Sequence, residues 1–112
     1  MIKQSATHTP EQLEQLANLF RLLGDRTRLN LLMLLSEGER NVTSLCETLH
    51  LPQPTVSHHL GLLRMSNVIS NRREGKQVFY SLDGKLSAAE GSMEIEGRRF
   101  QVSIRPRGIN GD

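Results

Sequence analysis

The stretch LPQPTVSHHLGLLR, residues 51–64, decides how the rest of the chain is interpreted. Its two prolines separate it from the preceding apolar segment, since proline interrupts one helix but suits the first turn of the next. At about 100° per residue, Val56, Leu60 and Leu63 fall on one side of a helix over about 54–66, as expected of a face that packs on a core. The sequence therefore predicts a short turn followed by an amphipathic helix.

The opposite side of this predicted helix carries small, polar and basic side chains. The candidates for contact with DNA on or beside it are Gln53, Pro54, Thr55, Ser57, His58 and Arg64. Glutamine can pair with adenine, and Ser, Thr and His can bond bases or phosphates. Gly61 lowers helix stability but leaves room for close approach of DNA. Any one of these residues fits an ordinary solvated face, whereas the set as a whole favours a surface that lies in a groove of DNA.

A shorter helix is predicted just before the turn. The apolar residues there are Val42, Leu45, Cys46 and Leu49. Their spacings of 3, 1 and 3 indicate an amphipathic helix starting near Thr43. Together the two helices predict a helix-turn-helix, a motif that is weak evidence alone because many small helical domains contain one.

The apolar pattern then changes to a period of two. Residues 68–71 and 77–82 are rich in β-branched and aromatic side chains, and Gly75 supplies the backbone freedom that a turn requires. Three bases surround this turn: Arg72, Arg73 and Lys76. A basic hairpin directly after a helix-turn-helix predicts a winged helix-turn-helix. In that fold the second helix enters the major groove of double-stranded DNA, and the wing, here 72–77, contacts the backbone or the minor groove.

The N-terminal part of the chain is predicted to be helical. Thr9 caps a first helix, with Pro10 at its first position and Gln12 three residues after the cap. The residues of its wide apolar stripe that we assign to a subunit interface are Leu13, Leu16, Leu19 and Phe20. A deeply packed helix and a helix shared with a partner subunit both fit this width. The next helix, over about 26–36, is apolar almost all round and belongs in the middle of the domain.

The segment after residue 83 has a different pattern. Residues 86–90 could form one or two helical turns, and strict alternation of apolar and polar residues begins after Gly91. One face of the alternating stretch carries Met93, Ile95, Phe100, Val102 and Ile104. We expect a hairpin over about 92–105 with a two-residue loop at Gly97-Arg98. The alternative is an extended, unpaired tail.

Length and composition bound the class of protein. The 112 residues suffice for one domain, which we divide into a flexible segment at 1–9, the winged helix-turn-helix at 10–83 and a C-terminal extension at 84–112. The single cysteine excludes an intrachain disulfide and fits a reducing cytosol. The sequence has neither a signal peptide nor a membrane-spanning run, so we expect a cytoplasmic protein with no membrane partner. A net charge of +2 leaves nucleic-acid binding to the local placement of bases.

Several motifs, in order along the chain, resemble the ArsR/SmtB family of transcriptional repressors. They are LGDRTRL at 23–29, LPQPTVSHHL at 51–60 and RREGKQVFYSL at 72–82. The resemblance covers about residues 13–83. It implies an α+β, mostly helical fold of four helices and a β-hairpin wing, and a homodimer that represses transcription at an inverted-repeat operator. It also implies an inducer, often a metal ion, that shifts the dimer to a form that fits DNA poorly.

Two departures from the family pattern bear on the inducer. Many metal-sensing members carry a Cys-x-Cys pair where this chain has Asn41 and Thr43, and only the later cysteine, Cys46, remains. One thiolate cannot form a tight site for a soft metal. Other members place Asp and His ligands on a long fifth helix, whereas this chain has no histidine after His59 and a predicted hairpin in place of that helix. We therefore expect no metal site and no cofactor, and leave the identity and existence of an inducer open.

The fifth helix also builds the dimer interface of the family, so this chain must form its dimer differently. We expect the first helix and the apolar face of the C-terminal hairpin to meet across the dimer. The predicted function is a sequence-specific, DNA-binding transcriptional regulator, and the alternative is a winged-helix module for protein interaction, which the near-neutral charge leaves open. An enzyme is not expected, because the sequence has no phosphate loop and no Cys/His pair at workable spacing.

Overall fold

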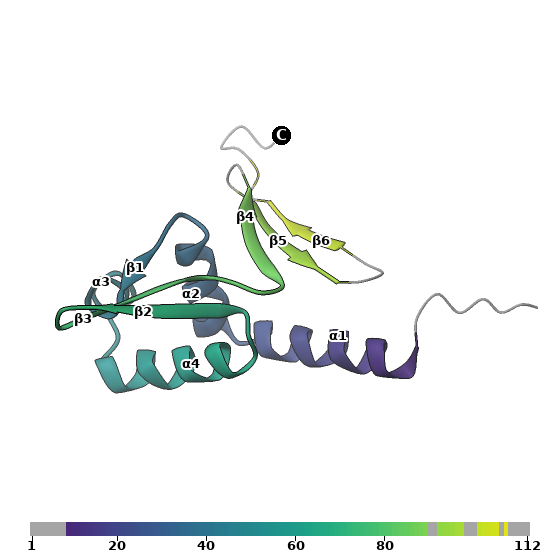
Figure 1. The fold of residues 1–112 in the computed structure, drawn as a ribbon, viewed down its shortest axis with the longest axis horizontal. Coiled ribbons are helices and arrows are strands. Elements are labelled where there is room, and N and C mark those ends of the chain that lie inside the picture. Colours follow the sequence, from purple (N-terminus) through teal and green to yellow (C-terminus); the bar gives the residue numbers. More distant parts are fainter. Residues whose placement is uncertain (1–8, 90–91, 98–100, 106, 108–112) are drawn as a thin grey trace, which may run out of the picture.

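The structure is a computed structural model of the chain that describes residues 9–89, 92–97, 101–105 and 107. Within these residues the chain forms four α-helices and two three-stranded antiparallel sheets (Figure 1). Among the described helices, none is long and apolar enough to cross a bilayer.

The first two helices begin where their caps predict. α1 (Pro10–Leu23) starts with the expected capping box. The Thr9 hydroxyl accepts a hydrogen bond from the backbone N–H of Gln12 at 3.1 Å, and the Gln12 side chain accepts one from the backbone N–H of Thr9 at 3.0 Å. Asp25 caps α2 (Arg26–Leu35) through its carboxylate. Local sequence therefore determines the start of both helices.

The helix-turn-helix comes after α2. α3 (Val42–Leu49) starts one residue before the predicted position, because the side chain of Asn41 accepts a hydrogen bond from the first turn at 2.8 Å. α4 (Gln53–Met65) agrees to within a residue with the helix predicted over about 54–66. The predicted motif is thus confirmed.

The wing is a three-stranded sheet, one strand more than the predicted hairpin. β2 (Ile69–Glu74) and β3 (Gln77–Leu82) pair antiparallel and are joined by Gly75 and Lys76. β1 (Arg40–Asn41) pairs with the other edge of β3. A strand of two residues is too short to show alternation, so β1 could not be predicted from the apolar pattern. Because β1 ends on the residue that caps α3, it joins the wing to the helix-turn-helix.

α2 is the element on which the others pack. Its residues Leu31, Leu32 and Leu35 are buried, and α1, α4 and β3 all contact it. This confirms the central position predicted from its all-round apolar sequence.

The C-terminal extension forms the second sheet, in the order β4 (Leu86–Ala89), β5 (Ser92–Glu96) and β6 (Gln101–Ile104). The predicted hairpin is confirmed as β5 and β6, and the alternative of an unpaired tail is wrong. The helical turns predicted over 86–90 are wrong in the described part of that stretch. Every residue of β4 pairs with β5, and this pairing overrides the weak helical preference of the segment.

The connection within the hairpin also differs from the prediction. A two-residue loop at Gly97-Arg98 would pair Glu96 with Arg99. The observed register pairs Glu96 with Gln101, which leaves four residues between the strands. The predicted loop type is therefore wrong.

One face of the C-terminal sheet completes the core of the chain itself. Met93 and Ile95 of β5 are buried in the same cluster as leucines of all four helices. The prediction that these two residues face a partner subunit is wrong, because alternation shows which face of a strand is apolar but not what covers it. Val102 and Ile104 of β6 are half-buried against the same cluster. Phe100, also predicted at the interface, lies outside the described residues.

The helix α1 extends away from the rest of the molecule (Figure 1). Near its C-terminal end, Leu19 and Leu23 are buried in the core, so Leu19 does not face outward as the interface prediction requires. Leu13 and Phe20 are 51% and 48% exposed, and Leu16 is half-buried. The apolar stripe of α1 is therefore shared between the core and the surface.

Gly84 joins the wing to the C-terminal sheet where two turns touch. Its φ of +61° is a conformation that side chains rarely adopt. A Cβ at this position would overlap the carbonyl oxygen of Asn67, in the turn after α4. Two residues later, Leu86 is buried in the core. The passage from β3 to β4 therefore requires glycine.

The other face of the C-terminal sheet is polar. The Glu94 carboxylate accepts hydrogen bonds from the side chains of Ser92 at 2.7 Å, Ser103 at 2.9 Å and Gln101 at 3.1 Å. These donors stabilise the charged form and hold the pKa of Glu94 below its usual range.

Burial of β5 predicts a large effect of truncation. Ile95→Ala should lower the free energy of unfolding by about 2–5 kcal/mol, the usual cost for a buried aliphatic side chain. Urea denaturation monitored by circular dichroism measures it. Val102→Ala on the neighbouring strand is the matched control and should cost less, because Val102 is half-buried. Equal stability of wild type and Ile95→Ala would contradict a core role for this sheet.

The lowered pKa of Glu94 predicts a pH dependence. A carboxylate whose pKa is lower in the folded than in the unfolded chain stabilises the fold above the unfolded pKa, and this contribution is lost as pH falls through the folded pKa. Below about pH 4.3, the ordinary value for glutamate, the free energy of unfolding of wild type should fall more steeply than that of Glu94→Gln. Parallel curves for the two proteins from urea titrations at each pH would count against this assignment.

Candidate nucleic-acid interface

The turn between α3 and α4 sets the direction of α4. His50 ends α3 with a left-handed backbone, φ 56°, and the backbone N–H of Leu51 donates to the carbonyl of Cys46 at 3.2 Å. Pro52 is extended, and Pro54 lies in the first turn of α4. The chain thus reverses within three residues, and α4 packs across α3 with one side outward.

The inner side of α4 is held by apolar packing. Val56, Leu60 and Leu63 are buried, as their spacing predicts. At the edge of this side, Nδ1 of His59 lies 3.4 Å from an Nη1 nitrogen of Arg28 in α2. The inner side is therefore committed to the core, and the opposite side is the one available for contact.

The outer side of α4 carries the residues predicted to contact DNA. The exposed ones are Gln53, Pro54, His58 and Arg64. Thr55 and Ser57 are half-buried. The Gln53 amide donates to the Ser57 hydroxyl at 2.9 Å across one helical turn, which orients both side chains.

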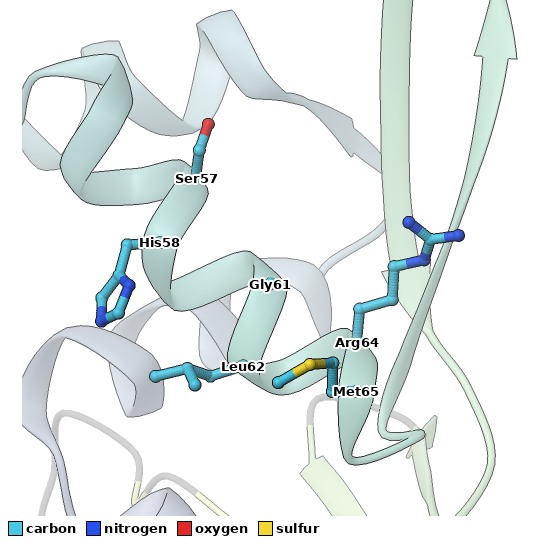
Figure 2. A pocket seen from close by; sticks show the side chains of 6 residues that line it. All are labelled: Ser57, His58, Gly61, Leu62, Arg64 and Met65. Carbon is cyan, nitrogen blue, oxygen red and sulfur yellow. The ribbon is translucent and has the colours of Figure 1, made fainter.

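Figure 2 shows an open hollow on this outer side. It is lined by Ser57, His58, Gly61, Leu62, Arg64 and Met65. A Cβ at Gly61 would have no atom within 4 Å, so the helix surface is bare at this point. Leu62 and Met65 lie beside each other, with Arg64 pointing away from them, and Met65 is 75% exposed. No role was predicted for Leu62 and Met65, although apolar side chains near a polar helix side are a signal that could have identified them.

A second hollow lies between the wing and the starts of α3 and α4. It is lined by Asn41, Val42, Thr43, Gln53, Lys76, Gln77 and Val78. The Asn41 side chain donates to that of Gln77 at 3.3 Å, which bridges the start of α3 to the wing. Two predicted site residues, Gln53 of α4 and Lys76 of the wing, therefore line the same hollow.

The three bases of the wing are not equivalent. Arg73 and Lys76 are exposed near its tip. Arg72 is also exposed, but it has a partner within the protein: its Nε and Nη2 each donate to a different carboxylate oxygen of Glu39, both at 2.9 Å. These hydrogen bonds lower the pKa of Glu39 and raise that of Arg72. The sequence groups the three bases, whereas the structure separates Arg72 from the other two.

Ligands for a metal do not gather in the described part of the chain. No three His, Cys, Asp or Glu side chains there come together as a metal site requires. Cys46 is a free thiol, half-buried against the core. The expectation that the protein carries no metal or cofactor stays a prediction from the sequence.

Comparisons with known proteins relate this geometry to a family. The chain is 46% identical over 71 residues to the arsenical resistance operon repressor of Escherichia coli, a match that covers 62% of this chain and 61% of that repressor. It is 42% identical over 71 residues to an HTH-type transcriptional regulator of Methanocaldococcus jannaschii, covering 62% of this chain and 80% of that protein. The chain belongs to the ArsR family.

The model of the bacterial regulatory proteins of the arsR family matches residues 25–71, from the cap of α2 into β2. A solved homodimeric winged helix-turn-helix DNA-binding domain from Mycobacterium bovis has a TM-score of 0.62 and 28% identity, covering 74% of this chain and 77% of that one. These matches confirm the predicted fold and family. ArsR members are regulatory proteins, so the prediction that the chain is not an enzyme is confirmed at the level of the family. The C-terminal sheet lies outside the family match.

The bare surface at Gly61 predicts opposite effects on folding and binding. Gly61→Ala should raise the free energy of unfolding by up to about 1 kcal/mol, because alanine is the better helix former and the added methyl group meets nothing. If DNA approaches this point closely, the methyl group should weaken binding about tenfold, equivalent to about 1.4 kcal/mol. Thermal unfolding and gel shifts measure the two quantities.

Gln15→Ala on the exposed surface of α1 serves as a comparison for Gly61→Ala. This variant should bind DNA as wild type does, because α1 lies apart from the outer side of α4 (Figure 1). Unchanged DNA affinity of Gly61→Ala would show that the helix does not approach DNA at this turn.

Proposed function

We propose that this ArsR-family chain is a homodimeric transcriptional repressor that binds an inverted-repeat operator. In this proposal α4 enters the major groove and the tip of the wing contacts the sugar–phosphate backbone. The observation that carries it is the outer side of α4. It carries polar and basic side chains beside Leu62 and Met65, it is fixed from behind by buried Val56, Leu60 and Leu63, and it is bare at Gly61.

Each predicted contact has a chemical role. Gln53 and Ser57, oriented by their mutual hydrogen bond, and exposed His58 would meet base edges. Arg64 and the exposed wing bases Arg73 and Lys76 would neutralise phosphates. Pro54 and Thr55 lie in the first turn of α4 and would lie close to the sugar–phosphate backbone of the DNA.

Dimerisation is proposed to occur through α1. Leu13 and Phe20 are large apolar side chains left about half exposed, with Leu16 between them. A helix of 14 residues packed only at one end is marginal in water by itself. A second copy laid on this stripe would cover it, and the Mycobacterium bovis relative is described as homodimeric. We propose that the protein acts in the cytoplasm.

Salt dependence tests the DNA-binding proposal. Duplexes retained by the protein from a randomised pool should yield a preferred sequence, and log K for that duplex should fall linearly with log of salt concentration, by about 0.9 per neutralised phosphate. Gel shifts or fluorescence anisotropy measure this slope. No retention of duplex from the pool at low salt would refute the proposal and favour a protein-interaction module, whose binding depends little on salt.

Base readout is tested at the turn of α4 that carries Ser57. Ser57→Ala and His58→Ala should each weaken binding to the selected duplex by about 1–3 kcal/mol and binding to random duplex by much less. Ser87→Ala on the exposed surface of β4 makes the same chemical change away from α4 and should leave both affinities unchanged. Equal losses on both duplexes for Ser57→Ala and His58→Ala would exclude base readout by these residues.

A further inference from the structure

The side chain of Arg72 crosses the wing sheet from one edge to the other. Arg72 in β2 pairs with Phe79 in β3, and Phe79 pairs with Asn41 in β1. The guanidinium lies over the Phe79 ring, 4.8 Å from its centroid. Beyond the ring it meets Glu39, two residues before Asn41 and therefore on the same face of the sheet.

The contacts of Arg72 engage most of its guanidinium donors, while 51% of the side chain stays exposed. Nε and Nη2 form the bidentate pair with Glu39 at 2.9 Å each, the strongest geometry for this kind of bond. Nη1 lies 3.5 Å from the carboxylate of Glu74. The aromatic ring covers one side of the plane. Arg73, the next residue, points to the other face of the strand and is exposed.

The far end of this contact lies on a segment that is itself attached to α3. Arg40 comes directly after Glu39, and its Nη1 lies 3.4 Å from the Ser44 hydroxyl and 3.3 Å from the Thr48 hydroxyl of α3. Its Nη2 also pairs with Glu37 at 3.2 Å. A continuous set of contacts therefore runs from the wing through Glu39 and Arg40 to the first helix of the helix-turn-helix.

We propose that Arg72 and Glu39 are positioning residues that hold the wing at a fixed angle to α3 and α4, and that Arg73 and Lys76 are the wing residues that contact phosphate. This inference rests on the proposed DNA-binding function. If Glu39 positions the wing, its carboxylate strengthens the binding of the protein to DNA even though it carries a negative charge. Simple electrostatics requires the opposite, since removal of a negative charge should favour a polyanion.

Positioning of the wing and simple electrostatics predict opposite changes in DNA affinity for Glu39→Ala. If Glu39 holds the wing, this variant should bind the duplex selected from the randomised pool about fivefold more weakly, the scale of an exposed ion pair. Glu47→Ala removes the same charge from the exposed surface of α3 and should bind as wild type or slightly more tightly. Binding of Glu39→Ala as tight as that of Glu47→Ala would overturn the proposal.

The salt slope separates positioning from phosphate contact. Arg73→Ala should reduce the slope of log K against log of salt concentration by about 0.9, the value for one phosphate. Arg72→Ala should weaken binding about as much as Glu39→Ala while it changes the slope by less than half of that amount. The double variant Glu39→Ala/Arg72→Ala should bind no more weakly than either single variant, because both remove one contact. A full loss of about 0.9 for Arg72→Ala would make Arg72 a phosphate ligand.

A conservative variant at Arg72 controls for loss of the folded structure. Arg72→Lys keeps the charge but lacks the planar fork that grips a carboxylate bidentately. A phosphate ligand would tolerate this change, whereas a positioning residue should not, so Arg72→Lys should bind more weakly than wild type at an unchanged melting temperature. Binding equal to wild type would overturn the proposal. Failure of wild type itself to bind any duplex would refute the proposed function, which is a separate outcome.

Discussion

The burial of α2 is the constraint on which the rest of the structure depends. Its leucines point in several directions, so one neighbouring element cannot cover them all. α1, α4 and β3 pack around it, and the C-terminal sheet adds Met93 and Ile95 to the same cluster. Because α4 is one of these covers, its inner side is fixed and its outer side must face away from the core. The surface proposed to meet DNA is therefore a geometric result of covering α2.

Features set by near neighbours in the sequence could be predicted. The capping box of α1, the turn before α4 and the two sides of α4 each depend on residues within a few positions of one another. Features set by distant pairs could not. β1 exists only because β3 pairs with it, and Arg72 is engaged by a carboxylate 33 positions away. In the sequence the three wing bases are alike, and only the fold distinguishes them.

The C-terminal sheet illustrates a further limit of prediction from sequence. Alternation identified the apolar face of β5 correctly, but a face that could pack on a partner and one that packs on its own core have the same pattern. The structure places Met93 and Ile95 inside the chain, and the large apolar side chains that it leaves exposed among the described residues are Leu13 and Phe20 of α1 and Met65 of α4. The sheet thus covers the core of its own chain, whereas the fifth helix of other family members was expected to build the dimer interface.

Gly84 also decides how the C-terminal sheet is attached to the rest of the chain. The segment that carries the surface proposed to meet DNA ends before this residue, and the C-terminal sheet beyond it buries Leu86, Met93 and Ile95 in the core. A junction that accepts a single residue type and backbone conformation keeps the two sides in fixed alignment, and apolar side chains from both sides share one core. The same core packs against the inner side of α4, so this one glycine links the placement of the C-terminal sheet to the packing behind the outer side of α4.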